Sequence, residues 1–191
     1  MATDTTTRLT YDDLVQLPDD GRRYEIIDGE LFVNAAPVPR HQMIVGNLYF
    51  ELATFFRRNG GGMVYLSPLD VVFDELNVTE PDVVVISSDR AGIVGKKNVQ
   101  GAPSLCIEVL SDSTRRLDEI HKRKLYERSG VDEYWIVDPV LEIVKVYRRG
   151  PSGYERAAEV STESGGAITT PLFRALSVDV TAVFTSPWSE A

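Results

Sequence analysis

The chain has 191 residues, 43% of them apolar, and its 20 basic and 29 acidic side chains give a net charge of −9. This length and composition predict a single domain with a sizeable core and exclude a largely disordered chain. Cys106 is the only cysteine, which excludes an intrachain disulfide and a zinc site built from thiolates. No early apolar run resembles a signal peptide, and no apolar stretch is long enough to span a bilayer. We therefore expect a cytoplasmic protein without a membrane partner.

The acidic balance is unusual for a protein that binds nucleic acid, because such binding usually relies on basic groups that displace counterions. The charge is uneven, however. The segment 115–128 holds six basic and three acidic residues, a local excess of three positive charges. Such a segment can be a phosphate-binding surface or an ordinary solvated helix face.

An Asp-Gly dipeptide at 28–29 stands between two runs rich in apolar residues. This dipeptide is favoured in two-residue hairpin turns, because both turn positions need a positive φ. We therefore expect an N-terminal β-hairpin with strands at 23–27 and 30–34.

The periodicity becomes helical after Pro37 and Pro39. From His41 the apolar residues that recur on one helical face are Ile44, Leu48, Leu52 and Phe55. The helix should end near Asn59, where three glycines follow.

Strands are expected in most of the chain that follows. The segments 63–66 and 70–74 are short and extended, whereas 81–86 and 105–110 are apolar runs typical of strands covered on both faces. Ser113 or Thr114 can cap a helix that runs to about Ser129 and stops at Gly130. Further strands are expected at 133–137 and 142–148, then one or two more, and a short helix near 178–184.

This order of elements predicts an α/β (α+β) fold in which a mixed central sheet is flanked by helices. No repeat or linker divides the chain. We expect one domain over residues 11–184, with flexible ends at 1–10 and 185–191.

Two acidic residues in the apolar strands point to chemistry. A buried carboxylate is costly unless something compensates it, and Glu108 stands among apolar neighbours on the face of Cys106 and Leu110. Asp82 stands at the start of the strand 81–86. If the two strands are neighbours, the carboxylates converge at one end of the sheet.

Two hard oxygen ligands, with waters and a substrate phosphate, are a usual environment for Mg²⁺. Such an ion lowers the pKa of a bound water and stabilises charge on a phosphoryl group. The alternative is structural: Glu108 pairs with a buried arginine or lysine.

Pro81-Asp82 followed by Glu108 in a strand resembles the PD-(D/E)XK nuclease superfamily. The whole chain is similar to its bacterial Uma-two branch of endonucleases. The stretches that carry the resemblance are Tyr24-Glu25-Ile26-Ile27-Asp28-Gly29-Glu30-Leu31, His41-Gln42, Gly46-Asn47-Leu48, Pro81-Asp82-Val83, Ile107-Glu108-Val109-Leu110-Ser111 and Gly130-Val131-Asp132-Glu133-Tyr134-Trp135-Ile136-Val137-Asp138-Pro139. With their flanks they cover about residues 11–184.

The resemblance implies a restriction endonuclease-like fold and hydrolysis of phosphodiester bonds that depends on Mg²⁺ or Mn²⁺. Asp82 and Glu108 carry over as metal ligands. The lysine of the superfamily normally lies two positions after the glutamate, where this chain has Leu110. Leucine cannot orient a water or stabilise an anion, so the plain motif is broken.

In the Uma-two branch the lysine lies in the following helix, four residues before a tyrosine, which gives Lys122 and Tyr126 here. The alternative for Lys122 is a surface ion pair with Asp118, four residues earlier. Lys124 is a second candidate, because it shares a helical face with Leu117 and His121. An ammonium group at such a site would position the attacking water or neutralise developing charge.

Two further residues are accessory candidates. Glu25 in the hairpin would supply a third acidic group, unless it is an exposed hairpin residue. His41 would contact a phosphate, unless it is a helix cap or a solvent contact.

Two hypotheses follow. The first is a metal-dependent nuclease, with DNA favoured by the resemblance alone. The second is an inactive nuclease-like domain that binds nucleic acid or a protein partner, which the acidic charge and Leu110 favour. A homodimer is expected by analogy with nucleases that pair two sites.

Overall fold

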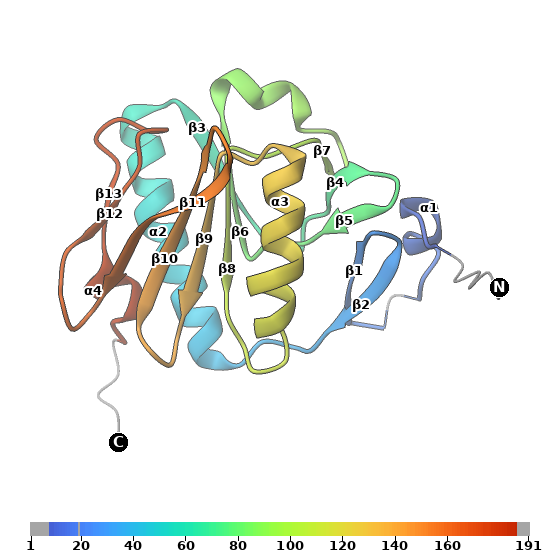
Figure 1. Cartoon of the computed structure of the whole chain (residues 1–191), viewed down its shortest axis with the longest axis horizontal. Helices are drawn as coiled ribbons and strands as arrows, with labels where there is room; N and C mark the ends of the chain where they lie inside the picture. Colours follow the sequence, from blue (N-terminus) through green and yellow to red (C-terminus); the bar gives the residue numbers. More distant parts are fainter. Residues whose placement is uncertain (1–7, 19, 187–191) are drawn as a thin grey trace.

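The computed structural model describes residues 8–18 and 20–186, which form two larger sheets and a small third one (Figure 1). The predicted hairpin is confirmed residue for residue: β1 is Arg23–Ile27 and β2 is Glu30–Asn34. Both turn residues have positive φ, 55° at Asp28 and 81° at Gly29. The hairpin starts a five-stranded sheet in the order β2-β1-β5-β4-β7, where β4 is Val71–Asp74, β5 is Asn77–Thr79 and β7 is Val99–Gln100.

The central sheet has six strands in the order β11-β10-β9-β8-β6-β3. The strands β6 (Val83–Ser87) and β8 (Leu105–Val109) pair antiparallel, and β8 pairs parallel with β9 (Glu133–Asp138). The sheet is therefore mixed, as predicted. Its outer strands are β3 (Gly62–Leu66), β10 (Ile143–Gly150) and β11 (Gly153–Ser161).

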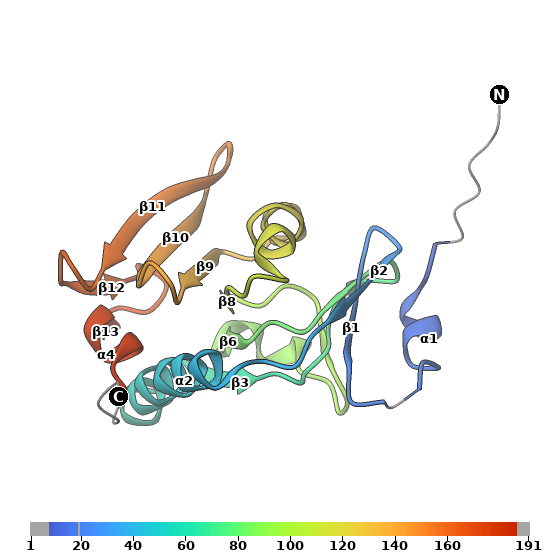
Figure 2. The ribbon, with the colours of Figure 1, turned by 90° about the horizontal axis from the view of Figure 1, so that it is seen from below.

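Helices cover both faces of the central sheet (Figure 2). On one face α2 (Pro39–Asn59) packs through the predicted residues Ile44, Leu48 and Leu52 against Ile107 and Val109. On the other face the helical pair η2 (Leu117–Lys122) and α3 (Arg123–Ser129) covers side chains of β8 and β9. Successive side chains of β8 point to opposite faces of the sheet. Cys106 and Leu110 therefore lie in the core between the sheet and the pair η2 and α3. Glu108 shares that second face, as expected.

The chain closes with β12 (Ala167–Thr169), β13 (Ser177–Asp179) and the short helix α4 (Val180–Phe184). The short helix was expected, but with β11 three strands precede it, in place of the one or two that were predicted. Several features were not foreseen: α1 (Tyr11–Leu14), η1 (Ser88–Ile93), the short strands β5 and β7, and the second sheet as a separate unit. The hairpin belongs to that second sheet.

The ends expected to be flexible, residues 1–10 and 185–191, lie only partly within the described part of the chain. Residues 1–7 and 187–191 lie outside the described residues. Within the expected N-terminal arm, the Leu9 N–H donates to the Gly29 carbonyl at 2.9 Å, and Thr10 forms a capping box with Asp13 at the start of α1. None of the helices in the described part is long and apolar enough to cross a bilayer.

The second long helix differs from its expected form at its start. Its first backbone groups are capped by Ser111, which accepts from the Thr114 N–H at 3.2 Å, in place of the expected Ser113 or Thr114. Its first part, η2, is a π-helix, in which the Arg123 N–H donates to the Asp118 carbonyl five residues back. Wider turns of this kind are rare and are frequently found at functional sites.

Candidate active site

The strands β6 and β8 bring Asp82 and Glu108 together. Val83 is opposite Ile107 in the antiparallel pair, so one further step of the register places Asp82 opposite Glu108. The Val109 N–H donates to Asp82 Oδ2 at 2.9 Å, which fixes one carboxylate against the strand of the other. The two acids are 4% and 3% exposed, respectively. The expected convergence of the two strands is confirmed.

Glu108 is held through one of its two carboxylate oxygens. Oε1 accepts from Lys122 Nζ at 2.9 Å and from the Tyr126 hydroxyl at 2.7 Å. The same hydroxyl lies 3.2 Å from Thr79 Oγ1 in the second sheet. Within residues 8–18 and 20–186, the hydrogen bonds of Glu108 fall on Oε1, so Oε2 is free to take another ligand.

Lys122 reaches three carboxylates at once. Its Nζ lies 2.9 Å from Glu25 Oε1, 2.9 Å from Glu108 Oε1 and 3.4 Å from Asp118 Oδ1. All four side chains are buried. The pairing with Asp118 is therefore present but is not the surface ion pair of the alternative interpretation. Lys122 is the last residue of the π-helix η2, and its side chain points toward Glu25 on β1 and Glu108 on β8.

Glu25 lies on the inner face of the hairpin strand β1 and is fully buried. Its Oε2 accepts from Asn34 Nδ2 at 2.7 Å, and its Oε1 accepts from the Glu80 N–H at 2.7 Å. The alternative of an exposed hairpin residue is wrong, because β1 is an inner strand between β2 and β5.

Asp82 has its own cationic and polar partners. His41 Nε2 lies 3.1 Å from Asp82 Oδ2, and Arg23 Nη1 donates to Oδ1 at 3.3 Å. His41 is buried in the first turn of α2, so it is neither a solvent contact nor a cap. Burial opposes ionisation, but the hydrogen bond from His41 and the attraction of nearby charges outweigh it and lower the pKa of Asp82.

Acidic groups outnumber permanent cations in this cluster. Four carboxylates, those of Glu25, Asp82, Glu108 and Asp118, face the two permanent cations Arg23 and Lys122. Burial raises the pKa of Glu108 well above its ordinary value and raises the pKa of Asp118 to about 6, although Lys122 acts in the opposite direction on both. Burial would lower the pKa of Lys122, but Glu108, Glu25 and Asp118 together raise it well above its usual value. The lysine therefore stays charged, and a further cation bound here would favour the ionised forms of Glu108 and Asp118.

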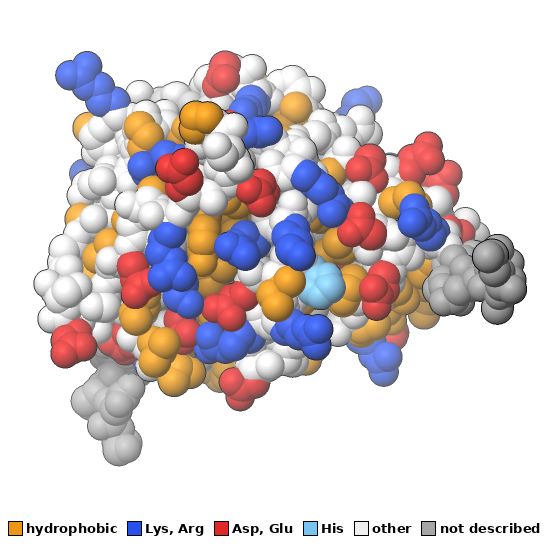
Figure 3. Space-filling view, in the orientation of Figure 1, with side chains coloured by type: hydrophobic (Ala, Val, Ile, Leu, Met, Phe, Trp, Pro, Cys, Tyr) orange, Lys and Arg blue, Asp and Glu red, His pale blue; other side chains and the backbone are white. Residues whose placement is uncertain are grey.

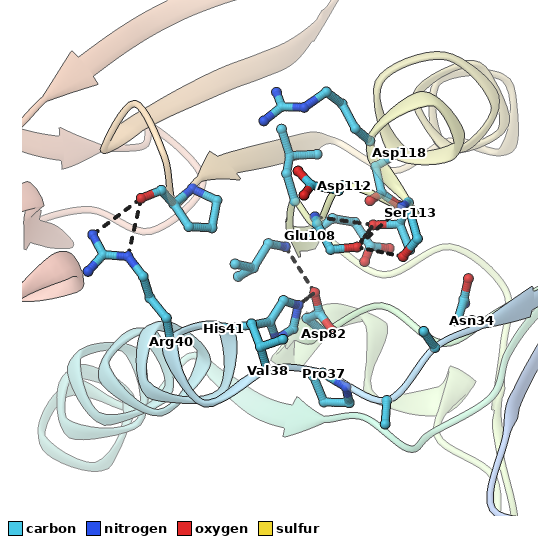
Figure 4. Close-up of a pocket in the computed structure, with 18 of the residues that line it drawn as sticks. Asn34, Pro37, Val38, Arg40, His41, Asp82, Glu108, Asp112, Ser113 and Asp118 are labelled. Carbon is cyan, nitrogen blue, oxygen red and sulfur yellow. Dashed lines mark hydrogen bonds and ion pairs between the residues drawn. The ribbon is translucent and has the colours of Figure 1, made fainter.

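Asp82, Glu108 and Asp118 lie at the floor of a cavity of about 670 Å³ (Figure 4). Its walls come from the segment between β2 and α2, the segment between β8 and η2, and the turn after β9. The cavity thus gives a ligand from solvent access to Asp82 and Glu108.

The donor set fits a hard divalent cation. Carboxylate oxygens are the ligands that Mg²⁺ prefers, and it commonly takes one or two of them and keeps several waters. Asp82 Oδ1 and Glu108 Oε2 both have capacity left. Among the described residues, no group of three or more His, Cys, Asp or Glu side chains forms a ready metal site. The two carboxylates would therefore need water and substrate oxygens to complete the shell.

Lys124 is not part of this cluster, because it is exposed on the outer side of α3. Sequence reasoning missed Arg23, which lies two positions before Glu25 and so shares its face of β1. The spacing of two positions in a predicted strand could have indicated that Arg23 lies beside Glu25. The partner Thr79 was not predictable, because β5 is short and was not expected as a strand.

The basic segment 115–128 forms a mixed surface. Figure 3 shows blue and red side chains interspersed over the face of η2 and α3. Lys122 is buried, Arg115 pairs with Asp138, and Arg128 pairs with Asp28. Three of the six basic residues are thus paired with carboxylates, whereas Arg116 and Lys124 are exposed.

Comparison with known families shows to which protein family the chain belongs. The family model described as "Uma2: Putative restriction endonuclease" matches residues 11–181. The chain belongs to the Uma2 family. The resemblance to the Uma-two branch is thereby confirmed, and no curated protein gives a significant match.

A solved structure shares the fold of this Uma2 protein. A crystal structure described as a "putative nuclease belonging to DUF820 from Anabaena variabilis" superposes with a TM-score of 0.76 at 19% identity, over 92% of this chain and 97% of that one. The fold is therefore restriction endonuclease-like. The type IIG restriction endonuclease BpuSI is a distant match, with a TM-score of 0.39 and 16% identity over 63% of this chain and 13% of that one.

Proposed function

We propose that this Uma2 protein is a Mg²⁺-dependent endonuclease that hydrolyses phosphodiester bonds of DNA, and that Mn²⁺ can replace Mg²⁺. The observation that carries the proposal is the meeting of Asp82 and Glu108 at the floor of an accessible cavity, in a cluster where acidic groups outnumber permanent cations. Membership of a nuclease family supports nucleic acid as the substrate class.

Asp82 and Glu108 would hold the ion. When bound, Mg²⁺ supplies positive charge to the phosphoryl group and lowers the pKa of a coordinated water. Arg23, His41 and the Val109 N–H fix the Asp82 carboxylate in place. Because the Asp82 carboxylate is already oriented, it loses little conformational entropy when the metal ion binds.

Lys122 and Tyr126 orient the carboxylate of Glu108. Both donate to Glu108 Oε1, which leaves Oε2 for the cation. The buried ammonium of Lys122 also provides fixed positive charge at the cavity floor, where negative charge develops on the phosphoryl oxygens during hydrolysis. Lys122 therefore takes the place that Leu110 cannot fill.

Cleavage assays test this proposal. Plasmid DNA, linear DNA and RNA are incubated with the purified protein and Mg²⁺ or Mn²⁺. We expect cleavage of DNA that is lost in Asp82→Ala and Glu108→Ala and retained in Glu163→Ala, an exposed control purified in parallel. Cleavage that survives Glu108→Ala would indicate a contaminating nuclease and overturn the proposal.

One observation favours a second function, a nuclease-like domain that binds nucleic acid or a protein without cutting. Glu108 already has a lysine partner, so part of its charge is compensated within the protein. This alternative predicts no Mg²⁺ or Mn²⁺ binding in calorimetry, so binding that is lost in Asp82→Ala would contradict it. The homodimer stays a prediction, which light scattering on the purified protein would test.

A further inference from the structure

The depth of the two acids restricts what can reach them. Asp82 and Glu108 are 4% and 3% exposed, and solvent reaches them through the cavity of about 670 Å³. This volume is in the range of pockets that enclose one small ligand, about 300–1,000 Å³. A phosphodiester must therefore enter the cavity to meet these carboxylates.

The mouth of the cavity carries exposed apolar side chains. Val38, just before α2, is 61% exposed, and Val140, in the turn after β9, is 76% exposed. Both line the cavity, and Figure 4 shows Val38 beside His41 and Asp82. Apolar walls with a few polar groups are typical of pockets for small organic ligands, and the face of a nucleobase is such a ligand surface.

The cations at the mouth are already paired. Arg40 binds Glu142 at 2.6 Å and the Pro139 carbonyl, and Arg115 binds Asp138 at 2.8 Å. Asp112 adds a negative charge to the wall. A duplex presents a dense row of phosphates and is bound mainly by unpaired basic groups. The paired arginines at this mouth therefore offer little positive charge to a long row of duplex phosphates.

We propose that the cavity receives an unpaired nucleotide, so that the preferred substrate is single-stranded DNA rather than an intact duplex. The base would lie between the apolar side chains of Val38 and Val140, and its phosphate would lie against Asp82 and Glu108. This inference rests on the proposed nuclease function. A nucleotide in a duplex reaches such a cavity only if it leaves the base stack, which costs free energy.

The test compares three substrates of one sequence with wild-type protein and Mn²⁺: a labelled single strand, its blunt duplex, and the duplex with an unpaired internal loop. We expect the single strand and the loop to be cut at least about tenfold faster than the blunt duplex. Equal or faster cleavage of the blunt duplex would overturn the inference and leave the nuclease function intact. Failure to cut any of the three would overturn the nuclease function and the inference together.

Variants at the mouth test the role of the apolar walls. Val140→Asp should lower single-strand cleavage about tenfold without loss of stability, because this side chain is 76% exposed, whereas Val140→Ile should retain the activity. The matched control is Met63→Asp on β3, which is 59% exposed and lies outside the cavity wall. Equal activity of Val140→Asp and Met63→Asp would overturn the placement of the base.

Discussion

The ammonium group of Lys122 lies 2.9 Å from Glu108 Oε1, and both side chains are almost fully buried. Removing charges from water is costly, and mutual attraction offsets the cost only with good geometry and additional hydrogen bonds. Glu25, Asp118 and Tyr126 supply those partners. The pair is therefore part of a network with more acids than cations, a costly arrangement for stability alone.

Lys122→Met should destabilise the protein by about 3–5 kcal/mol, because it leaves buried carboxylates without their cation. Urea unfolding followed by circular dichroism measures the change. The matched control is Lys124→Met, two residues along the same helical segment but exposed, which we expect to change stability by less than about 0.5 kcal/mol. Equal stability of the two variants would contradict the buried network.

Glu108→Gln should change the free energy of unfolding at pH 7 by less than about 1 kcal/mol, because burial raises the pKa of Glu108 and makes its ionised form costly, so that little is lost when the charge is removed. The same variant should lose Mn²⁺ binding in calorimetry.

The control for this experiment is Glu133→Gln. Glu133 is equally buried, but its oxygens accept from Arg148, Thr170 and Trp135. Because its charge is well compensated, Glu133→Gln should cost about 1–3 kcal/mol. A larger loss of stability in Glu108→Gln than in Glu133→Gln would show that Glu108 is primarily structural.

Tyr126→Phe removes the hydroxyl that donates to Glu108 at 2.7 Å. We expect a loss of about 1–2 kcal/mol of stability and about tenfold slower DNA cleavage, because the carboxylate is less well oriented. Tyr154→Phe is the control, since that hydroxyl donates to the Val131 carbonyl at 3.0 Å and makes no contact with Glu108. Cleavage that is equally slow in both variants would mean that loss of stability, rather than orientation of Glu108, is responsible.

The sequence predicted the elements with strong local signals. The Asp28-Gly29 turn fixed the hairpin strands, and helical spacing from His41 gave α2. The position of Lys122 followed from the resemblance, since the lysine comes from a helix and no spacing along β8 indicates it. The π-helix itself has no sequence signal, because it depends on how η2 packs against β1 and β8.

Partners from distant strands could not be predicted. Glu25 is buried among Asn34, the Glu80 N–H and Lys122, and β5, which ends just before Glu80, has only three residues. Arg23 meets Asp82 across 59 positions of sequence, which only the tertiary fold brings together.

Asp138 provides a pH-dependent test of the turn that carries Val140. Burial opposes ionisation of Asp138, but Arg115 and the N–H groups of Leu141 and Val140 outweigh it and lower its pKa. A lowered pKa in the folded state stabilises the protein above the pKa of the unfolded state, near 3.8, and this contribution is lost as the pH falls further. Asp138→Asn should therefore cost about 1–2 kcal/mol at pH 7.

Urea unfolding at neutral pH and near pH 3 measures this difference. We expect the gap between wild type and Asp138→Asn to shrink in acid. A gap that stays constant with pH would contradict the charge-assisted pairing of Asp138 with Arg115.

The most direct test of the metal site is anomalous diffraction from crystals soaked in Mn²⁺. We expect an anomalous peak in contact with carboxylate oxygens of both Asp82 and Glu108, at the floor of the cavity beside Lys122. The same soak of Glu108→Gln should show no peak there. Mn²⁺ bound elsewhere in the wild type, with Asp82 and Glu108 in contact only with protein groups, would contradict the proposal that these two carboxylates bind the metal ion.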